Sequence, residues 1–403
     1  MKSFRKLDGV FLLLGVAWCL FAAAVMAGNQ SQSGTVTKSA YGITSGHVAV
    51  EQYTLTNSDG LTVKIITYGG IITSIANPSR KMPDIVLGFS SLNDYETKNA
   101  PHFGAIIGRY ANRIADGVFK LNGVTYCLDA NNGPNTLHGG FKGFDTKVWT
   151  ATKVIQGPAG VGVQLHYLSP AGDGWTNTAP NPNCPADATR GFPGNLDTYV
   201  TYTLNDQNQL IIHYEATTDA PTVVNLTNHT YWNLSGEGTG TIYPDLVMLN
   251  ANQFTPVNSD LIPDGTERPV AGTVFDFRSP KAVSTGIRTN DPQLVYGKGY
   301  DLNWIVNSHG SGKTLPLAAT VYDPVSKRTL KVFTDQPGIQ LYTGNSLDGT
   351  VYGTSNREYR QSDGLALETQ HYPDSPNHPN FPSTVLLPGQ TYQTTTIFEI
   401  QDR

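Results

Sequence analysis

The stretch YVTYTL at residues 199–204 alternates between half-polar and apolar side chains, and LIIHY at 210–214 follows it after a short polar turn. A side-chain period of two is that of a β-strand with one buried face. The same texture recurs along the chain at 52–55, 61–66, 71–75, 330–333 and 392–400. Between some of these runs stand Gly pairs and Asp-Gly, which are typical turn residues.

No segment carries a helical stripe of ten or more residues. The chain has 403 residues, of which 39% are hydrophobic and only 15% charged, so it can bury a large core. No break in composition and no internal repeat marks a second domain. We therefore predict one all-β domain over 47–403, a large antiparallel β-sandwich.

The first residues are typical of a secretory signal. Residues 1–27 combine an apolar run from Val10 to Val25 with small residues at Val25 and Ala27, before Gly28. Basic residues precede that run: Lys2, Arg5 and Lys6. We expect cleavage and secretion, after which the protein has no membrane attachment; a retained N-terminal membrane anchor is the competing interpretation.

The segment after the signal, 28–46, is rich in Ser, Thr, Gly and Gln and is predicted to be a flexible lead-in. It contains Asn29, the more plausible glycosylation acceptor of this chain. A second polar segment, 171–190, has hardly any apolar residues and is predicted to be a long surface loop. Outside the signal the cysteines are Cys127 and Cys184, and the sequence leaves open whether they pair or stay free.

Charge and missing motifs exclude several classes of function. The formal net charge is −5 and no basic patch is present, which argues against a nucleic-acid partner. The chain has no GxGxxG after a strand, no P-loop, no HExxH, no CxxC pair and no GxSxG. No pair of histidines shows a recognised metal-ligand spacing. We expect neither a cofactor nor a metal.

Two motifs place polar groups in unusual surroundings. GRYANRI at 108–114 sets two arginines and an amide in an apolar run, where each needs a partner; a binding site and a structural network are both compatible with it. In NNGPNTLHGG at 131–140, His138 precedes two glycines, which permit a sharp turn or the close approach of a ligand. A loop histidine alone is more often a solvated or structural residue.

A third motif, NLTNHTYWNL at 225–234, reads as one strand. Its alternation sets five polar or aromatic groups on one face, with His229 in the middle. Such a face suits a concave sheet surface that binds a polyol. The motif also holds three glycosylation sequons, which we expect to be unused because glycans there would block the surface.

A fourth motif is GLALETQ at 364–370, in which Glu368 follows an apolar strand. A carboxylate in such a place is costly unless it is paired or functional. Burial would raise its pKa and neighbouring donors would lower it. Glu368 is the candidate general base.

These segments together resemble the aldose 1-epimerase family, the galactose mutarotases, over residues 47–400. The resemblance rests on motifs in family order: ANRI at 111–114, NNGPNTLHGG at 131–140, GFPGNLDTYVTYTL at 191–204, NLTNHTYWNL at 225–234 and LETQHYPDSPNHPNFPSTVLLPGQTY at 367–392. It implies a galactose mutarotase-like supersandwich with an open cleft for a hexose. It implies no cofactor.

The resemblance also implies roles for particular residues. Glu368 would be the base acting on the C1 hydroxyl, His229 the acid that protonates the ring oxygen, and His138 a hydrogen-bonding group near that oxygen. Asn112 and Arg113 match the family pair that lines the sugar site.

A further role and one difference come from the same comparison. Asp301 lies where the family uses an aspartate to grip sugar hydroxyls, although its flanks, Tyr300 and Leu302, differ from the usual Phe-Asp-His-Asn. The segment 171–190 is longer than expected for a bacterial member.

These residue types fit anomerisation on chemical grounds. A base removes the C1–OH proton while an acid protonates the ring oxygen, and the C1–C2 bond turns before the ring closes again. Positioned acid and base groups typically contribute about 10²–10⁴-fold each. The expected activity is therefore an isomerase acting on hexoses such as D-galactose and D-glucose, in a protein that we expect to be a monomer.

Other functions remain as alternatives. A hexose 6-phosphate epimerase should need a basic cluster beyond Arg109 and Arg113. A glycoside hydrolase or lyase needs two carboxylates, which Glu368 and Asp301 could supply, but His229 fits that chemistry less well. A non-catalytic carbohydrate-binding protein would not need the set of His138, His229 and Glu368.

Overall fold

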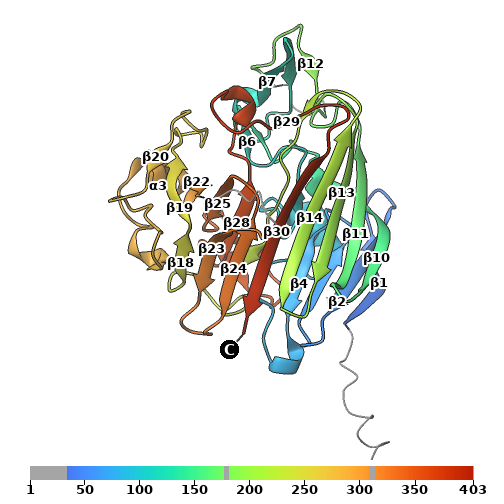
Figure 1. Ribbon diagram of the computed structural model, residues 1–403, viewed down its shortest axis with the longest axis vertical. Coiled ribbons are helices and arrows are strands. Elements are labelled where there is room, and N and C mark those ends of the chain that lie inside the picture. Colours follow the sequence, from blue (N-terminus) through green and yellow to red (C-terminus); the bar gives the residue numbers. More distant parts are fainter. Residues whose placement is uncertain (1–33, 177–180, 308–313, 403) are drawn as a thin grey trace, which may run out of the picture. The chain divides into compact units, whose positions relative to one another are not determined.

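The computed structural model describes residues 34–402, apart from 177–180 and 308–313. The predicted signal peptide and Asn29 lie outside these residues. The described part is built almost entirely of β-strands in antiparallel sheets, as the sequence predicted (Figure 1). Its α-helices are α2 (Leu92–Lys98) and α3 (Pro292–Gly297), and its 3₁₀ helices are three residues long each. None of the described helices is long and apolar enough to cross a membrane.

The largest sheet has nine strands, and each strand pairs with its neighbours in antiparallel register. In spatial order its strands are β10 (Thr150–Gly157), β11 (Gly160–Ser169), β13 (Leu196–Leu204), β14 (Gln209–Thr218), β30 (Tyr392–Gln401), β24 (Thr329–Thr334), β23 (Leu317–Tyr322), β18 (Leu246–Leu249) and β21 (Lys281–Ala282). The predicted alternation is confirmed in β13, where every second side chain is buried from Leu196 to Leu204.

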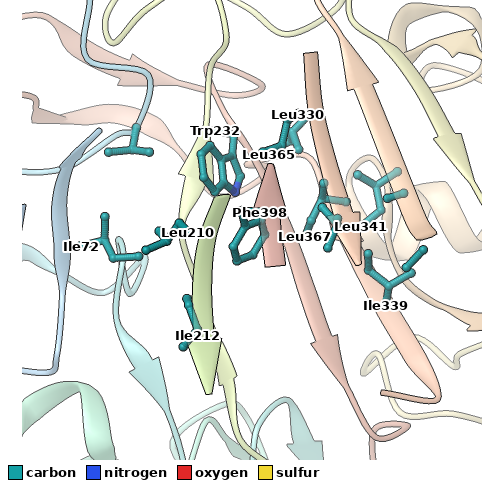
Figure 2. Packing of buried hydrophobic residues seen from close by; sticks show 14 of the residues in the cluster. Ile72, Leu210, Ile212, Trp232, Leu330, Ile339, Leu341, Leu365, Leu367 and Phe398 are labelled. Carbon is teal, nitrogen blue, oxygen red and sulfur yellow. The ribbon is translucent and has the colours of Figure 1, made fainter. Parts of the chain in front are cut away.

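A six-stranded sheet lies against the large one. Its strands are β17 (Tyr231–Trp232), β28 (Leu365–Gln370), β25 (Gly338–Tyr342), β22 (Asp301–Val306), β19 (Ala251–Thr255) and β20 (Arg268–Pro269). Figure 2 shows Leu365 and Leu367 of β28 beside Phe398 of β30, within one buried hydrophobic cluster. This packing uses one face of β28 and leaves its other face for the site.

A four-stranded sheet contains β1 (Thr35–Ile43), β2 (Ala49–Thr56), β3 (Thr62–Ile66) and β4 (Ile72–Ala76). The prediction of a flexible lead-in is therefore wrong for 35–43. The polar residues of β1 are exposed on an edge strand, but the backbone pairs with β2 from Thr35↔Thr56 to Ile43↔Ala49. Backbone pairing, which composition does not report, orders this segment.

Shorter sheets connect the larger ones. They pair β12 (Thr189–Arg190), β8 (Val124–Cys127) and β7 (Val118–Leu121); β5 (Ile106–Ile107) and β16 (Thr227–Asn228); β6 (Arg113–Ile114) and β9 (Thr136–Leu137); β15 (Thr222–Val223) and β29 (Val385–Leu386); and β26 (Asp348–Tyr352) and β27 (Glu358–Arg360). The β12–β8 pairing is parallel.

The motif at 225–234 departs from the prediction of one strand. It forms the two short strands β16 and β17, with His229 between them, because the chain changes partners from β5 to β28. Its sequon residues are buried, and each amide nitrogen donates a hydrogen bond within the fold: Asn225, Asn228 and Asn233. They are not presented to solvent as glycan acceptors.

Candidate active site

All of the predicted site residues line one cavity of about 530 Å³. They come from positions far apart in the sequence: Asn112, Arg113, His138, His229, Asp301 and Glu368. A volume of this size lies within the range of small-molecule sites. The fold therefore brings the residues of the separate motifs to one place.

Glu368 is positioned by the alternation of β28. Its neighbours Leu367 and Thr369 face the large sheet, where the Thr369 hydroxyl contacts that of Thr396, so Glu368 faces the cavity. The residue is only 2% exposed. The pKa of Glu368 is raised to about 8, mainly by burial and also by the charge of Asp301, while the charge of Arg113 opposes the shift.

His229 is held by its backbone between β16 and β17. Its N–H donates to the carbonyl of Ala105, and its carbonyl accepts from the N–H of Gly104. The Nε2 atom lies 3.6 Å from Oε1 of Glu368. Burial lowers the pKa of His229 to about 3, and the neighbouring His102 adds to the shift.

Together these two groups hold one proton near neutral pH. Each shift is caused mainly by burial, which disfavours the charged form of either side chain. At rest the pair is then a protonated Glu368 and a neutral His229. Moving the proton across the 3.6 Å gap gives carboxylate and imidazolium without changing the net charge.

His138 is fixed in one neutral form. Its Nδ1 accepts a hydrogen bond of 3.2 Å from the backbone N–H of Asn112, which leaves the ring proton on Nε2. Burial lowers the pKa of His138 well below its usual value, and His102, His229 and Arg113 reinforce this effect. His138 therefore presents an N–H donor.

The glycine after His138 lets two backbone segments of the site approach each other closely. Gly139 has φ of +86°, and a Cβ there would lie 2.1 Å from the carbonyl oxygen of Gly108. Gly139 thus permits the close approach of two segments of chain, whereas the motif predicted a sharp turn or the close approach of a ligand.

Arg113 reaches the same turn through strand pairing. It stands opposite Leu137 in the β6–β9 pair, next to His138. Its Nε donates to Oδ1 of Asn132 at 3.0 Å, and a second nitrogen lies 3.4 Å from Oδ1 of Asn112. These amides fix the guanidinium at the cavity wall.

Asp301 begins β22 and pairs across the sheet with Tyr342. Its Oδ1 accepts a hydrogen bond of 2.6 Å from Nε2 of Gln340, which stands opposite Glu368 in the β25–β28 pair. Burial raises the pKa of Asp301, while Arg113 and Gln340 oppose that shift. Two carboxyl groups and the amide between them thus share one edge of the site.

Comparisons with known proteins agree with this geometry. Residues 51–399 match the family model described as aldose 1-epimerase. The chain belongs to the aldose 1-epimerase family. It is therefore an isomerase of the aldose 1-epimerase type.

Relatives of this epimerase cover nearly its whole length. A galactose mutarotase of Mus musculus is 42% identical over 91% of this chain and 98% of its own. The aldose 1-epimerase of Escherichia coli K12 is 38% identical over 86% and 94%. A solved galactose 1-epimerase from Lactobacillus acidophilus NCFM is 27% identical, covers 92% and 99%, and superposes with a TM-score of 0.77.

The site also contains residues that the sequence analysis did not predict. Gln340 is, like Glu368, a polar residue within an apolar strand, and this pattern could have identified it. Lys98 and Lys298 also line the cavity, so the epimerase has basic groups at its site beyond Arg113. His102 lines it as well, and nothing in its sequence surroundings predicted that position.

Arg109 has a structural position in this epimerase. It is 1% exposed, and its guanidinium donates to backbone carbonyls of 169–170 and 193–194 and to the hydroxyls of Ser169 and Thr222. Of the two arginines in the GRYANRI motif, one thus stabilises the fold and the other lines the cavity.

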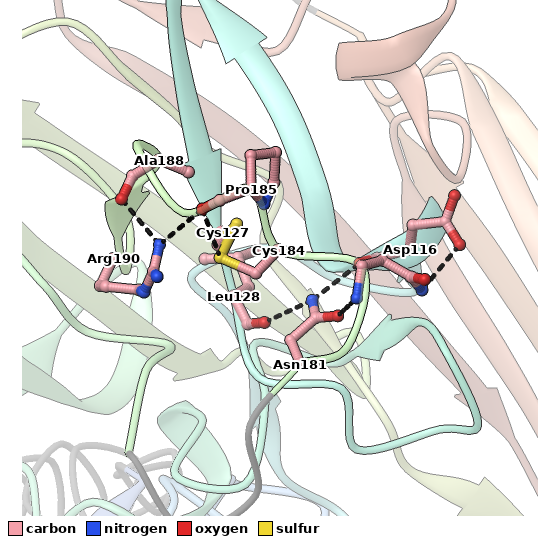
Figure 3. Close-up of a disulfide and its surroundings, with 9 residues drawn as sticks. Asp116, Cys127, Leu128, Asn181, Cys184, Pro185, Ala188 and Arg190 are labelled. Carbon is pink, nitrogen blue, oxygen red and sulfur yellow. Dashed lines mark hydrogen bonds between the residues drawn. A yellow bond between two sulfur atoms is a disulfide. The ribbon is translucent and has the colours of Figure 1, made fainter.

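The segment 171–190 of the epimerase is attached to the part of the chain between Arg113 and His138. Cys184 forms a disulfide with Cys127, and the Asn181 amide donates to the carbonyls of Asp116 and Leu128 (Figure 3). The two contacted segments follow Arg113 and precede His138. In its described residues, 171–176 and 181–190, the predicted loop is confirmed, except that Thr189–Arg190 forms the short strand β12.

Three site residues could also hold a metal ion. His138, His229 and Glu368 each offer one ligand atom, and these atoms lie within 4.8 Å of one another. Because the residues are far apart in sequence, no ligand spacing could have revealed the set. The expectation of a reaction without a metal stays a prediction.

Proposed function

We propose that this epimerase interconverts the α and β anomers of D-galactose and D-glucose, with Glu368 and His229 moving the protons. One observation carries the proposal: a carboxyl and an imidazole, both almost fully buried, lie 3.6 Å apart in a cavity of a size that suits a sugar. The galactose mutarotases among the relatives, at 41–42% identity, support D-galactose as a substrate.

Ring opening uses the proton that the pair shares. Its transfer from Glu368 to His229 produces the carboxylate and imidazolium that the reaction needs. The carboxylate removes the C1 hydroxyl proton, the C1=O bond forms as the bond from C1 to the ring oxygen breaks, and that oxygen takes the proton of His229. Rotation about C1–C2 and closure on the other carbonyl face reverse these steps.

The remaining residues bind and orient the sugar. His138 donates its Nε2–H to an oxygen beside the reacting bond, where it stabilises developing charge. Arg113 and Asn112 bind hydroxyl groups from one wall of the cavity. Asp301, held by Gln340, accepts hydrogen bonds from sugar hydroxyls on the other.

We also propose that the protein is secreted after cleavage at residue 27 and acts as a monomer. The charged start, the apolar run and the small residues before Gly28 support cleavage. The Cys127–Cys184 disulfide fits an oxidising compartment. Every residue assigned a role comes from one chain, so the site needs no second copy.

The rival activities fit the cavity less well. For a 6-phosphate, Lys98 is already paired with Asp94 at 2.7 Å, and the carboxyl group of Asp301 lies in the same cavity. For glycoside hydrolysis, the group that lies 3.6 Å from the Glu368 carboxyl is an imidazole rather than a second carboxylate. A non-catalytic binding protein would have no use for a buried, proton-sharing pair.

Polarimetry tests the proposal. Fresh α-D-galactose and α-D-glucose should change their optical rotation faster with the protein than in buffer, and galactose 6-phosphate should be a poorer substrate. A variant with both Glu368→Gln and His229→Ala, purified identically, should leave only the buffer rate. A wild-type protein that does not exceed the buffer rate, or a double variant as active as wild type, contradicts it.

A further inference from the structure

His102 is a third histidine of the cavity, and none of the roles above uses it. It sits in a turn with φ of +61°. The turn is held by hydrogen bonds from the His102 N–H to the Asn99 carbonyl and from the Ala105 N–H to the His102 carbonyl. Such a φ is uncommon for a residue other than glycine, and these hydrogen bonds fix the backbone that carries the side chain.

A carboxylate orients the ring of His102. Its Nδ1 lies 2.9 Å from Oδ2 of Asp145, whose side chain is only 9% exposed. An ionised carboxylate only accepts hydrogen bonds, so Nδ1 carries a proton that it donates to Asp145. Within the part of the chain that the structure describes, this is the only hydrogen bond of the ring, so Nε2 remains available to a ligand.

His102 of the cavity thus forms a second histidine–carboxylate pair with Asp145, in addition to the pair of His229 and Glu368. The His102 ring packs against His138 at a centroid distance of 4.8 Å and against His229 at 5.9 Å. Side-chain exposure rises from 3% at Glu368 and 5% at His229 to 18% at His102. His102 therefore lies at the outer side of the reacting pair.

We propose that Nε2 of His102 hydrogen-bonds the primary hydroxyl on C6 of the hexose, and that the Asp145–His102 pair makes the enzyme favour hexoses over sugars that lack this group. The inference rests on the proposed function, which sets Glu368 at the C1 hydroxyl and His229 at the ring oxygen.

The order of atoms around the pyranose ring supports this assignment. The ring oxygen is bonded to C1 on one side and to C5 on the other. Glu368 occupies the C1 side, so the next substituent past the ring oxygen is the hydroxymethyl group on C5. That group extends farthest from the ring, and it therefore reaches toward the more exposed side, where His102 stands.

Removing the ring nitrogens of His102 should lower kcat/KM only for sugars that carry a C6 hydroxyl. His102→Phe keeps an aromatic ring against His138 and cannot bind a hydroxyl. The kcat/KM for D-galactose should fall about tenfold, as expected for the loss of one hydrogen bond. For 6-deoxy-D-galactose, which has no C6 hydroxyl, it should change less than about twofold, because no such hydrogen bond is lost.

His102→Asn provides a second variant, because asparagine accepts a positive φ well and is too short to replace the ring. Thermal unfolding of each variant checks the fold. A selective loss on D-galactose in either folded variant supports the proposal. Equal losses on both sugars, which a merely structural role would give, or no loss on either, overturn it.

Asp145→Asn tests the orienting carboxylate. It should reduce the preference for D-galactose over the 6-deoxy sugar without reducing the rate on the latter, and an unchanged preference counts against the pair. Failure of the proposed function has a different signature: the wild-type protein would then accelerate neither sugar, whatever residue stands at 102.

Discussion

Strands β14 and β28 have the same side-chain period but different surroundings. In β14 buried residues alternate with half-exposed ones from Gln209 to Ala216, whereas all six residues of β28 are buried. The polar groups on the outer face of β14 meet neighbours or water; the ring of His213, for instance, lies 2.9 Å from the Thr395 hydroxyl. In β28, Oε2 of Glu368 and both amide atoms of Gln370 are buried without a hydrogen-bond partner among the described residues.

This difference between β14 and β28 distinguishes polar residues that the fold tolerates from polar residues that serve the site. A polar residue on the outer face of β14 costs little, because water solvates it. On β28 the same kind of residue loses water and gains no full set of partners, which is costly unless a ligand supplies them. Matched substitutions on the two strands therefore separate these two effects.

The largest effect is expected from Glu368→Gln. The change keeps the shape of the side chain but removes the group that exchanges a proton, so kcat/KM on D-galactose should fall by about 10²–10⁴-fold. Polarimetry measures the loss. The matched change Glu215→Gln on the outer face of β14 should leave activity unchanged, and equal losses in both variants would refute the assigned role.

The next largest effect concerns the hydrophobic core on the buried face of β14. Ile212 is fully buried and its neighbour Ile211 is half-exposed on the opposite face of β14. Ile212→Ala should lower the free energy of unfolding by about 2–5 kcal/mol. Ile211→Ala should cost clearly less. Urea denaturation measures both, and similar losses would show that the two faces of β14 are equally desolvated.

The disulfide should have a smaller effect on stability. It closes a loop between positions 57 residues apart, and Cys184→Ser should lower the free energy of unfolding by about 2–4 kcal/mol. The expected cause is greater freedom of the unfolded chain, so wild type in reducing buffer should show the same loss. A Cys184→Ser variant as stable as oxidised wild type would contradict this prediction.

The smallest effect is a gradual dependence on pH. Burial raises the pKa of Glu368 to about 8, so below that pH the pair with His229 holds one proton, and above it that proton is lost. With no proton left for the ring oxygen, kcat/KM should fall by about tenfold per pH unit above about pH 8. Buffer rates are subtracted at each pH. A rate that rises through pH 8 would mean that His229 is not the acid.

Local sequence determined the strands well. The alternation at 199–204 and 210–214 became β13 and β14, because every second residue there is apolar enough to require burial. The motif at 225–234 was predicted less well. Its alternation is real, but the chain changes partners around His229, and two-residue strands leave no periodic signal.

The site residues likewise divide into those that local sequence predicts and those that only long-range contacts reveal. Glu368 could be identified because a carboxylate in an apolar strand is costly wherever that strand lies. His102 could not be identified, because its position in the site depends on contacts with Asp145 and with the rings of His138 and His229. All three of these residues are distant from it in sequence. Segment 35–43 was mistaken for flexible chain for a similar reason, since its order comes from pairing with β2.

The sequence by itself determined the all-β class, the buried face of each long strand and the residues whose chemistry needs a special environment. Those properties depend on side-chain type and on neighbours in the chain. Only the tertiary structure decided that an imidazole and a carboxyl separated by more than a hundred residues lie 3.6 Å apart and almost fully buried. Proximity and desolvation set their pKa values, and both arise from long-range packing.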